Sequence, residues 1–144
     1  MGQDEEIHDS PTGWVKKHIQ SYVESDGSKG LQYNGYASLL LTTRGRKSGL
    51  LRRTALYYGE NGDNYVIVAS NGGDDHHPSW YLNLSENPEV EVQVGADKFT
   101  ALAHTADAEE RATLWPLMVK IFPTYAKYQA KSKREIPVVV LVKQ

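Results

Sequence analysis

The sequence contains no cysteine, and this absence removes several kinds of chemistry. Disulfide bonds, iron–sulfur clusters and thiol nucleophiles are excluded in a chain of 144 residues without a thiol. Long apolar runs are missing too, since the longest, such as Val138–Val142, are strand-sized and fall short of the roughly 20 residues of a membrane-spanning helix. The acidic start, MGQDEEIHDS, lacks the apolar stretch of a secretory signal. We therefore expect a cytoplasmic protein whose first residues are a frayed end.

Positive charge is in slight deficit overall but is concentrated in one place. The formal net charge of −2 argues against a general nucleic-acid-binding protein. The stretch TTRGRKSGLLRRTALYY nevertheless holds five of the sixteen Lys and Arg residues: Arg44, Arg46, Lys47, Arg52 and Arg53. Gly45 and Gly49 allow a ligand near the backbone, Ser48 offers a hydroxyl, and guanidinium groups suit phosphate and carboxylate. The stretch predicts a site for a small anion, although a solvated hairpin tip has the same composition.

Hydrophobic periodicity predicts about six strands and three or four helices, without the alternating βαβ rhythm of a parallel sheet. Short hairpin spacings, such as the one around the Asn-Gly pair at residues 61–62, favour antiparallel pairing. We therefore predict an α+β fold, an antiparallel barrel with peripheral helices. The predicted strands are Ala37–Thr43, Arg53–Tyr58, Tyr65–Ser70, Glu89–Val94, Phe99–His104 and Ile136–Val142. The predicted helices are Pro11–Val23, Pro78–Leu84, one that begins at an Asp107–Glu110 capping box, and one that begins at Pro123.

Groups that can do chemistry unaided are few in this sequence. It shows no Ser–His–acid arrangement, no nucleophile elbow and no pair of carboxylates in apolar surroundings. The stretch DDHHP at Asp74–Pro78 has metal-binding residue types, but adjacent side chains diverge and the helical His spacing is missing, so we predict no metal site. Nine tyrosines against two phenylalanines favour an amphipathic cavity. This pattern is typical of a protein whose cofactor performs the difficult step.

Five segments in order resemble the deazaflavin-dependent nitroreductase family of actinobacteria. They are TTRGRKSGLLRRTALYY, YVIVASNGG, HPSWYLNLSENPEVEVQV, ERATLWPLMVKIFPTYAKYQ and REIPVVVLV, between Ala37 and Leu141. The string T-x-G-R-K-S-G and the later N-P-x-V-x-V-Q strand are the most specific parts. The resemblance implies a split β-barrel that binds coenzyme F420, a deazaflavin with a phosphate and an oligoglutamate tail. It also implies hydride transfer from the reduced deazaflavin to a quinone-like or nitro-aromatic acceptor.

The same resemblance implies a role for individual residues. The phosphate and tail would meet Arg46, Lys47, Ser48 and Arg52, and the cofactor would run along Thr54, Ala55 and Tyr57. The ring would be edged by Val68, Ala69, Ser70, Asn71, Ser79, Trp80 and Tyr81. Ser70, Tyr125 and Tyr128 would be the catalytic residues beside the acceptor. The resemblance assigns no contact to Arg44 and Arg53, and we expect these two side chains to be solvated. Ala55, Asn71 and Phe122 differ from a prodrug-reducing member, so the resemblance implies cofactor binding more directly than nitroimidazole reduction.

Several alternatives stay open at the level of sequence. An FMN-dependent reductase of the same fold needs a similar anion site, and a deazaflavin carrier needs no turnover. Residues 1–30 are predicted as a tail and an amphipathic helix, ahead of a deazaflavin-binding barrel domain of residues 31–144. The helix would serve as a lid over the substrate pocket or associate weakly with a membrane surface, where quinones are found. Its acidic leader and its two lysines favour the lid.

Overall fold

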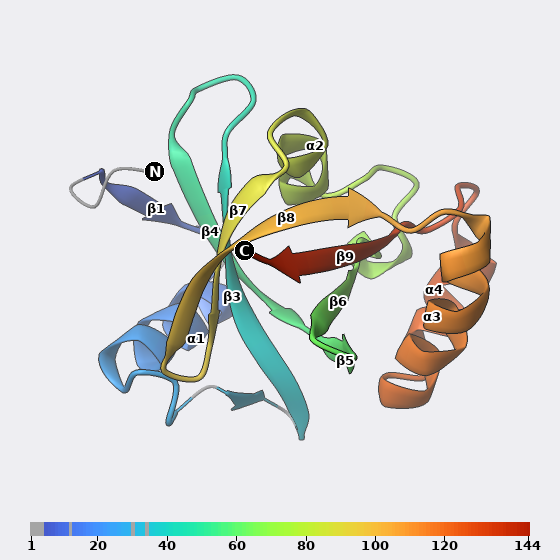
Figure 1. Cartoon of the computed structure of the whole chain (residues 1–144), viewed down its shortest axis with the longest axis horizontal. Coiled ribbons are helices and arrows are strands. Elements are labelled where there is room, and N and C mark those ends of the chain that lie inside the picture. Colours follow the sequence, from blue (N-terminus) through green and yellow to red (C-terminus); the bar gives the residue numbers. More distant parts are fainter. Residues whose placement is uncertain (1–4, 12, 30, 34) are drawn as a thin grey trace.

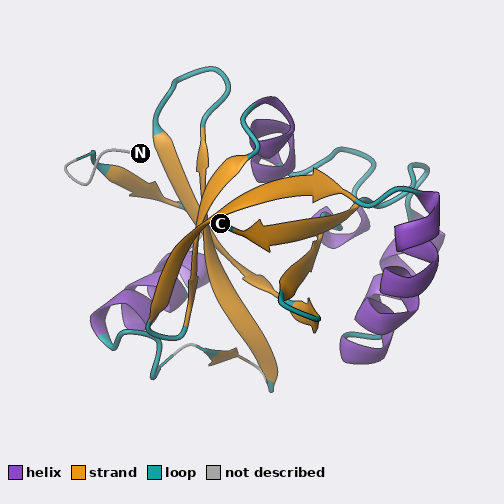
Figure 2. Cartoon of the chain, in the orientation of Figure 1, coloured by secondary structure: helices purple, strands orange, loops and turns teal. Residues whose placement is uncertain are grey.

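The computed structural model describes residues 5–11, 13–29, 31–33 and 35–144. Within these residues the chain forms four α-helices, one short 3-10 turn and nine strands (Figures 1 and 2). The strands are β1 (Ile7–Asp9), β2 (Gln32–Tyr33), β3 (Tyr36–Arg44), β4 (Leu51–Tyr57), β5 (Gly59–Asn61), β6 (Asn64–Val68), β7 (Glu89–Val94), β8 (Asp97–Thr105) and β9 (Val138–Lys143). The helices are α1 (Gly13–Glu24), α2 (Ser79–Glu86), α3 (Ala108–Ile121) and α4 (Thr124–Lys131), and the turn is η1 (Asn71–Gly73).

The strands form one sheet in the order β1-β4-β3-β7-β8-β9-β6-β5, with β2 paired to β3 alone. Every pair is antiparallel except β1 with β4, which is parallel. The predicted α+β class is confirmed, but the predicted number of about six strands is wrong. The strands that were missed, β1, β2 and β5, have two or three residues each. Segments this short carry no periodicity, so their pairing depends on partners elsewhere in the chain.

The apolar run of β3 is explained by burial on both faces of the sheet. Leu39 and Leu41 belong to the main core, which Phe99 also joins, whereas Leu40 packs with Ile19 of α1. Successive side chains of a strand point to opposite faces, so the run separates two apolar layers. Because Leu40 faces the side opposite to the main core, its contact with Ile19 holds α1 against that face of the sheet.

The helices α3 and α4 lie beside one another at one end of the sheet (Figure 1). The predicted capping box at the start of α3 is confirmed, because Asp107 Oδ1 accepts from the Glu110 N–H at 2.8 Å and Glu110 Oε1 accepts from the Asp107 N–H at 3.3 Å. Met118 of α3 and Tyr125 of α4 are buried in one cluster with Val138 of β9. This packing places the tyrosines of α4 next to the end of β6.

The N-terminal residues pack on the same sheet. The strand β1 pairs in register with Leu51–Arg53, so the expectation of a frayed start is wrong for Ile7–Asp9. The helix α1 begins at Gly13, close to the predicted position, and buries Val15, Ile19 and Tyr22. The predicted domain boundary at residue 30 lies outside the described residues. No helix in the described ranges is long and apolar enough to cross a membrane.

Replacing Tyr22 by phenylalanine is expected to lower the free energy of unfolding by about 1–2 kcal/mol. The Tyr22 hydroxyl accepts from the Gly95 N–H at 2.7 Å and lies 3.1 Å from the Ser38 carbonyl oxygen, so it links α1 to β3 and to the β7–β8 turn. Urea unfolding measures the change. The matched control is Tyr65→Phe, whose hydroxyl has no hydrogen bond to the described residues, and a loss of equal size there would contradict this role.

Candidate cofactor site

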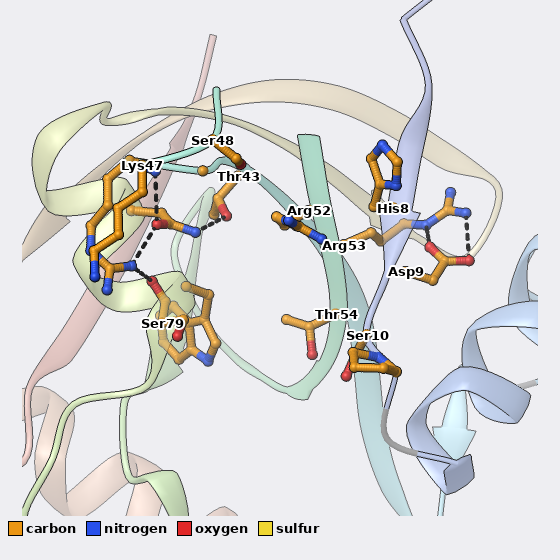
Figure 3. A pocket seen from close by; sticks show the side chains of 15 residues that line it. His8, Asp9, Ser10, Thr43, Lys47, Ser48, Arg52, Arg53, Thr54 and Ser79 are labelled. Atoms are coloured by element: carbon orange, nitrogen blue, oxygen red, sulfur yellow. Dashed lines mark hydrogen bonds and ion pairs between the residues drawn. The ribbon is translucent and has the colours of Figure 1, made fainter. Parts of the chain in front are cut away.

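A cavity of about 460 Å³ lies between the β3–β4 turn, α2 and β1, and we call it the anion cavity (Figure 3). It brings together all four residues predicted to meet the phosphate and tail, namely Arg46, Lys47, Ser48 and Arg52, and its lining comes from four separate parts of the chain. Its lining consists of His8, Asp9, Ser10, Pro11, Thr43, Gly45, Arg46, Lys47, Ser48, Arg52, Arg53, Thr54, Ser79, Trp80 and Asn83.

Asn83 fixes the β3–β4 turn to α2. Its Oδ1 accepts from the Arg46 N–H at 3.1 Å and from Arg46 Nη1 at 2.9 Å, and its Nδ2 donates to Thr43 Oγ1 at 3.3 Å. The Arg46 guanidinium is thereby held along the wall of the cavity by neutral oxygen atoms, which leave its charge uncompensated. The sequence analysis did not identify Asn83 as a site residue. The available signal was an amide side chain on the apolar face of a short helix. A buried amide of this kind needs partners.

The turn itself depends on close backbone packing. The Gly45 N–H donates to the Leu50 carbonyl at 2.7 Å, and the Leu50 N–H donates to Ser48 Oγ at 3.2 Å. A Cβ on Gly45 would lie only 2.6 Å from Ser48 Oγ, so a larger residue would displace that hydroxyl. Gly49 adopts a φ of 72°, which favours glycine. The two glycines therefore shape the turn that presents Arg46, Lys47 and Ser48.

The five clustered cations divide into two groups. Arg44 forms an ion pair with Glu5, whose pKa is lowered by the hydrogen bond from Arg44. The guanidinium of Arg53 binds both carboxylate oxygens of Asp9, at 2.6 and 3.2 Å. The expectation that these two arginines are solvated is therefore wrong.

Three of the five cations have no acidic partner among the residues that the structure describes. Within the described part of the chain, Lys47 and Arg52 have no acidic partner, and Arg46 bonds only to neutral oxygens. These are the cations predicted for an anionic tail, and all of them line the anion cavity. Segregation of the other two into ion pairs leaves this cavity with a local excess of positive charge in an acidic protein.

A second cavity, of about 340 Å³, lies between α1, β4, the end of β6 and α4, and we call it the aromatic cavity. Phe122 lies among its tyrosines, with ring centroids 5.1 Å from Tyr57 and 4.9 Å from Tyr125. The participation of Trp14 and His18 from α1 makes this helix one wall of the cavity. The complete lining is Trp14, His18, Ser38, Ala55, Leu56, Tyr57, Val68, Ser70, Gly72, Phe122, Tyr125 and Tyr128.

The hydroxyl groups of Ser70, Tyr125 and Tyr128 in the aromatic cavity are available as hydrogen-bond donors. Tyr125 is only 5% exposed, and burial is the main cause that raises the pKa of its phenol, so the group stays protonated at neutral pH. Neither Tyr125 nor Ser70 directs its hydroxyl into a hydrogen bond with the described residues. The carbonyl of Ser70, by contrast, accepts from Arg134 Nη2 at 2.9 Å, which holds the backbone of this loop.

The two cavities meet along β4. Arg52, Arg53 and Thr54 line the anion cavity, whereas Ala55, Leu56 and Tyr57 line the aromatic cavity, so the two cavities follow one another along the strand. Because β1 pairs only with Leu51–Arg53, the edge of β4 beyond Arg53 has no strand partner on that side among the described residues. Beyond Arg53, backbone N–H and C=O groups on this side of β4 are therefore not used in strand pairing among the described residues.

Some predicted residues line neither cavity. Ala69 is fully buried, Asn71 donates from Nδ2 to the His76 carbonyl at 3.0 Å, and the Tyr81 hydroxyl bonds to Thr105 Oγ1 at 2.8 Å. Their contact with a cofactor stays a prediction. In the Asp74–Pro78 loop, Asp74 Oδ1 accepts a hydrogen bond from the His76 N–H at 2.9 Å. The described residues contain no group of three or more His, Asp or Glu side chains that could hold a metal ion.

Comparison with known proteins gives one consistent result. A family model described as F420H(2)-dependent quinone reductase matches residues 14–143. The chain is 37% identical over 144 aligned residues to an F420H(2)-dependent quinone reductase of Mycobacterium tuberculosis, with 91% of this chain and 97% of the relative covered.

Solved structures agree in both fold and sequence. One, described as a domain-swapped dimer, superposes with a TM-score of 0.71 at 40% identity and covers 92% of this chain and 99% of its own. Another, described as an F420-H2 dependent reductase (FDR-A), has a TM-score of 0.67 at 44% identity over 72% of this chain and 92% of its own. On the strength of the family match and of these relatives, this chain belongs to the F420H(2)-dependent quinone reductase family.

Proposed function

We propose that this protein uses reduced F420 to transfer a hydride to a quinone-like or nitro-aromatic acceptor. The observation that carries the proposal is a pair of cavities at consecutive positions of β4, one lined by cations without an acidic partner among the described residues and the other by tyrosines. The names of the relatives support F420 as the cofactor and a quinone as the acceptor. A phosphate with an acidic tail and a flat aromatic ring are the two chemical parts that such a site suits.

The chemistry of the donors fits the tail of F420. Arg46, Lys47 and Arg52 would hold the phosphate and the first carboxylates, with the Ser48 hydroxyl as a further donor. Hydrogen bonds to charged groups contribute about 1.5–3 kcal/mol each, so two or three of them are enough to anchor a ligand. Ser79 and Trp80 would lie against the same part of the cofactor, since both line the anion cavity.

We further propose that the sheet works as a split barrel, with the cofactor lying across the gap beside β4. The strand order is an open path that begins at β1 and ends at β5, and β4 and β6 approach each other across it. The open edge of β4 supports this arrangement, because its unpaired N–H and C=O groups can bond to the polar edge of a ring. Val68 and Ser70, at the end of β6, would border the opposite side.

When bound, reduced F420 supplies the hydride, and the protein positions and stabilises the partners. The hydroxyls of Tyr125 and Ser70 donate to the acceptor oxygen on which negative charge develops, which lowers the barrier to transfer. Burial keeps the Tyr125 phenol protonated, so it remains a donor throughout the neutral range. The aromatic walls, with Tyr57, Phe122 and Tyr128, exclude water from the reacting groups.

Steady-state oxidation of reduced F420 with menadione tests the proposal. We expect a rate well above the rate without enzyme, and the same assay with reduced FMN serves as the control. A rate with FMN alone would favour a flavin-dependent reductase, and F420 binding without turnover would favour a carrier.

A cytoplasmic location and weak association of α1 with a membrane surface stay predictions.

Replacing Asn83 by leucine is expected to weaken F420 binding about tenfold, because loss of the amide frees the β3–β4 turn from α2 and leaves Arg46 unpositioned. Fluorescence titration measures the affinity. Asn87→Leu, just beyond the same helix, is the matched control, because the Asn87 side-chain amide forms no hydrogen bond with the residues that the structure describes. Equal affinities for parent and Asn83→Leu would show that the amide does not position the turn.

A further inference from the structure

One wall of the anion cavity comes from residues that precede the family match. Residues 5–11, which we call the N-terminal strap, lie ahead of residue 14, where that match begins. The parallel pairing of β1 with β4 sets His8 beside Arg52 and Asp9 beside Arg53. The Ser10 N–H extends the pairing by donating to the Arg53 carbonyl at 2.9 Å. The strap is therefore a built wall of the cavity rather than a loose end.

We infer that the strap makes the anion cavity select F420 with a short acidic tail, because Asp9 occupies Arg53 in place of a tail carboxylate. The inference rests on the proposed function and adds to it a discrimination by tail length. No chemical step is involved, since the selection is made entirely in binding.

The Asp9–Arg53 pair is well placed to compete with a ligand. Both residues line the cavity, and their side chains are mostly buried, with 23% of Asp9 and 18% of Arg53 exposed. A glutamyl carboxylate offers the same two oxygens that Arg53 already binds in Asp9. A tail carboxylate must therefore displace Asp9 to reach Arg53, and it meets the like charge of Asp9 if it does not.

The other end of the strap is held outside the cavity. Glu5 pairs with Arg44, whose Nη1 also donates to the Gly49 carbonyl at 2.8 Å. This contact ties the strap to the same turn that presents Lys47 and Ser48. The wall is thus fixed at two points, and an incoming ligand cannot simply push it aside without breaking an ion pair.

The charges of the cavity are arranged from one side to the other. Figure 3 shows Lys47 and Ser48 on one side, Asp9 and Arg53 on the other, and Arg52 between them. A phosphate with few carboxylates is satisfied by the first side and by Arg52. With the tail running along this line, each additional carboxylate would lie closer to Asp9, which already pairs with Arg53.

The experiment compares the affinities of short-tailed and long-tailed F420, measured by isothermal titration of the full chain. In Asp9→Asn, the ratio of long-tail to short-tail affinity is expected to rise about three- to tenfold, because Arg53 becomes available and a repelling charge is lost. In Arg53→Gln, the ratio is expected to fall, because Asp9 then faces the cavity without its partner. Opposite changes in the two variants cannot arise from a general loss of folding.

Asp97→Asn is the matched control, since it removes one carboxylate and one ion pair, with Lys143 at 3.0 Å, outside the cavity lining. Its ratio is expected to equal that of the parent. An unchanged ratio in both Asp9→Asn and Arg53→Gln, with both tails still bound by the parent, would overturn the inference alone. A parent that binds neither form of F420 would overturn the proposed function, and the inference with it.

Discussion

Replacement of both Arg46 and Lys47 by alanine is expected to weaken F420 binding about a hundredfold, as measured by fluorescence titration. Each side chain supplies a charge-assisted contact worth about 1.5–3 kcal/mol, and tenfold in affinity corresponds to about 1.4 kcal/mol. We take the lower end of that range because Lys47 is exposed and its charge is partly screened by solvent. The folded state should survive, since neither side chain belongs to the core.

The paired control removes two cations elsewhere. Lys16 and Lys17 are exposed on α1 and line neither cavity, so their joint replacement by alanine changes the net charge equally. We expect an affinity within about twofold of the parent for that variant, together with a hundredfold loss in the cavity variant. Equal losses would mean that overall charge, and not the anion cavity, attracts the cofactor.

Tyr125→Phe is expected to slow menadione reduction by about ten- to a hundredfold while the affinity for F420 stays within about twofold. Loss of one donor to a developing oxyanion commonly costs more than this, but the Ser70 hydroxyl lines the same cavity and remains. The phenyl ring keeps its contacts with Phe122 and Tyr128, so the shape of the cavity is preserved. Steady-state rates at saturating F420 separate turnover from binding.

The pH dependence gives an independent check on Tyr125. Burial raises its phenol pKa, so this group should not lose its proton as the pH approaches the ordinary phenol value of about 10. The ratio of parent to Tyr125→Phe rates is therefore expected to be constant between about pH 6 and 9. A ratio that collapses within this interval, or equal rates for the two proteins, would remove Tyr125 from the mechanism. Tyr65→Phe, outside the aromatic cavity, is the control for loss of a phenol.

The long elements of the fold were predictable because each has a strong local pattern. The alternation in Glu89–Val94 and the apolar run in β3 reflect the faces that they bury, and the capping box at Asp107 specifies a helix start through bonds within four residues. The strand β1 was not predictable, since Ile-His-Asp has no period and its partner β4 lies more than forty residues later. Such pairing is decided by tertiary contacts.

The kind of site could be predicted from the sequence, but the ion pairs within it could not. Arginine, lysine and glycine in one turn indicated an anion, and the structure gathers Arg46, Lys47 and Arg52 around one cavity. Sequence could not separate these cations from Arg44 and Arg53, because the acidic partners Glu5 and Asp9 stand 39 and 44 positions earlier in the chain. Partners so far apart in sequence cannot be recognised from a local pattern, and they become neighbours only when β1 pairs with β4.

The most direct test of the account is a titration of the purified protein with F420, followed by fluorescence, beside an identical titration with FMN. The account predicts saturable binding of F420 that Arg46→Ala/Lys47→Ala weakens, with much weaker binding of FMN. Tight binding of FMN to a protein that does not bind F420 would contradict it.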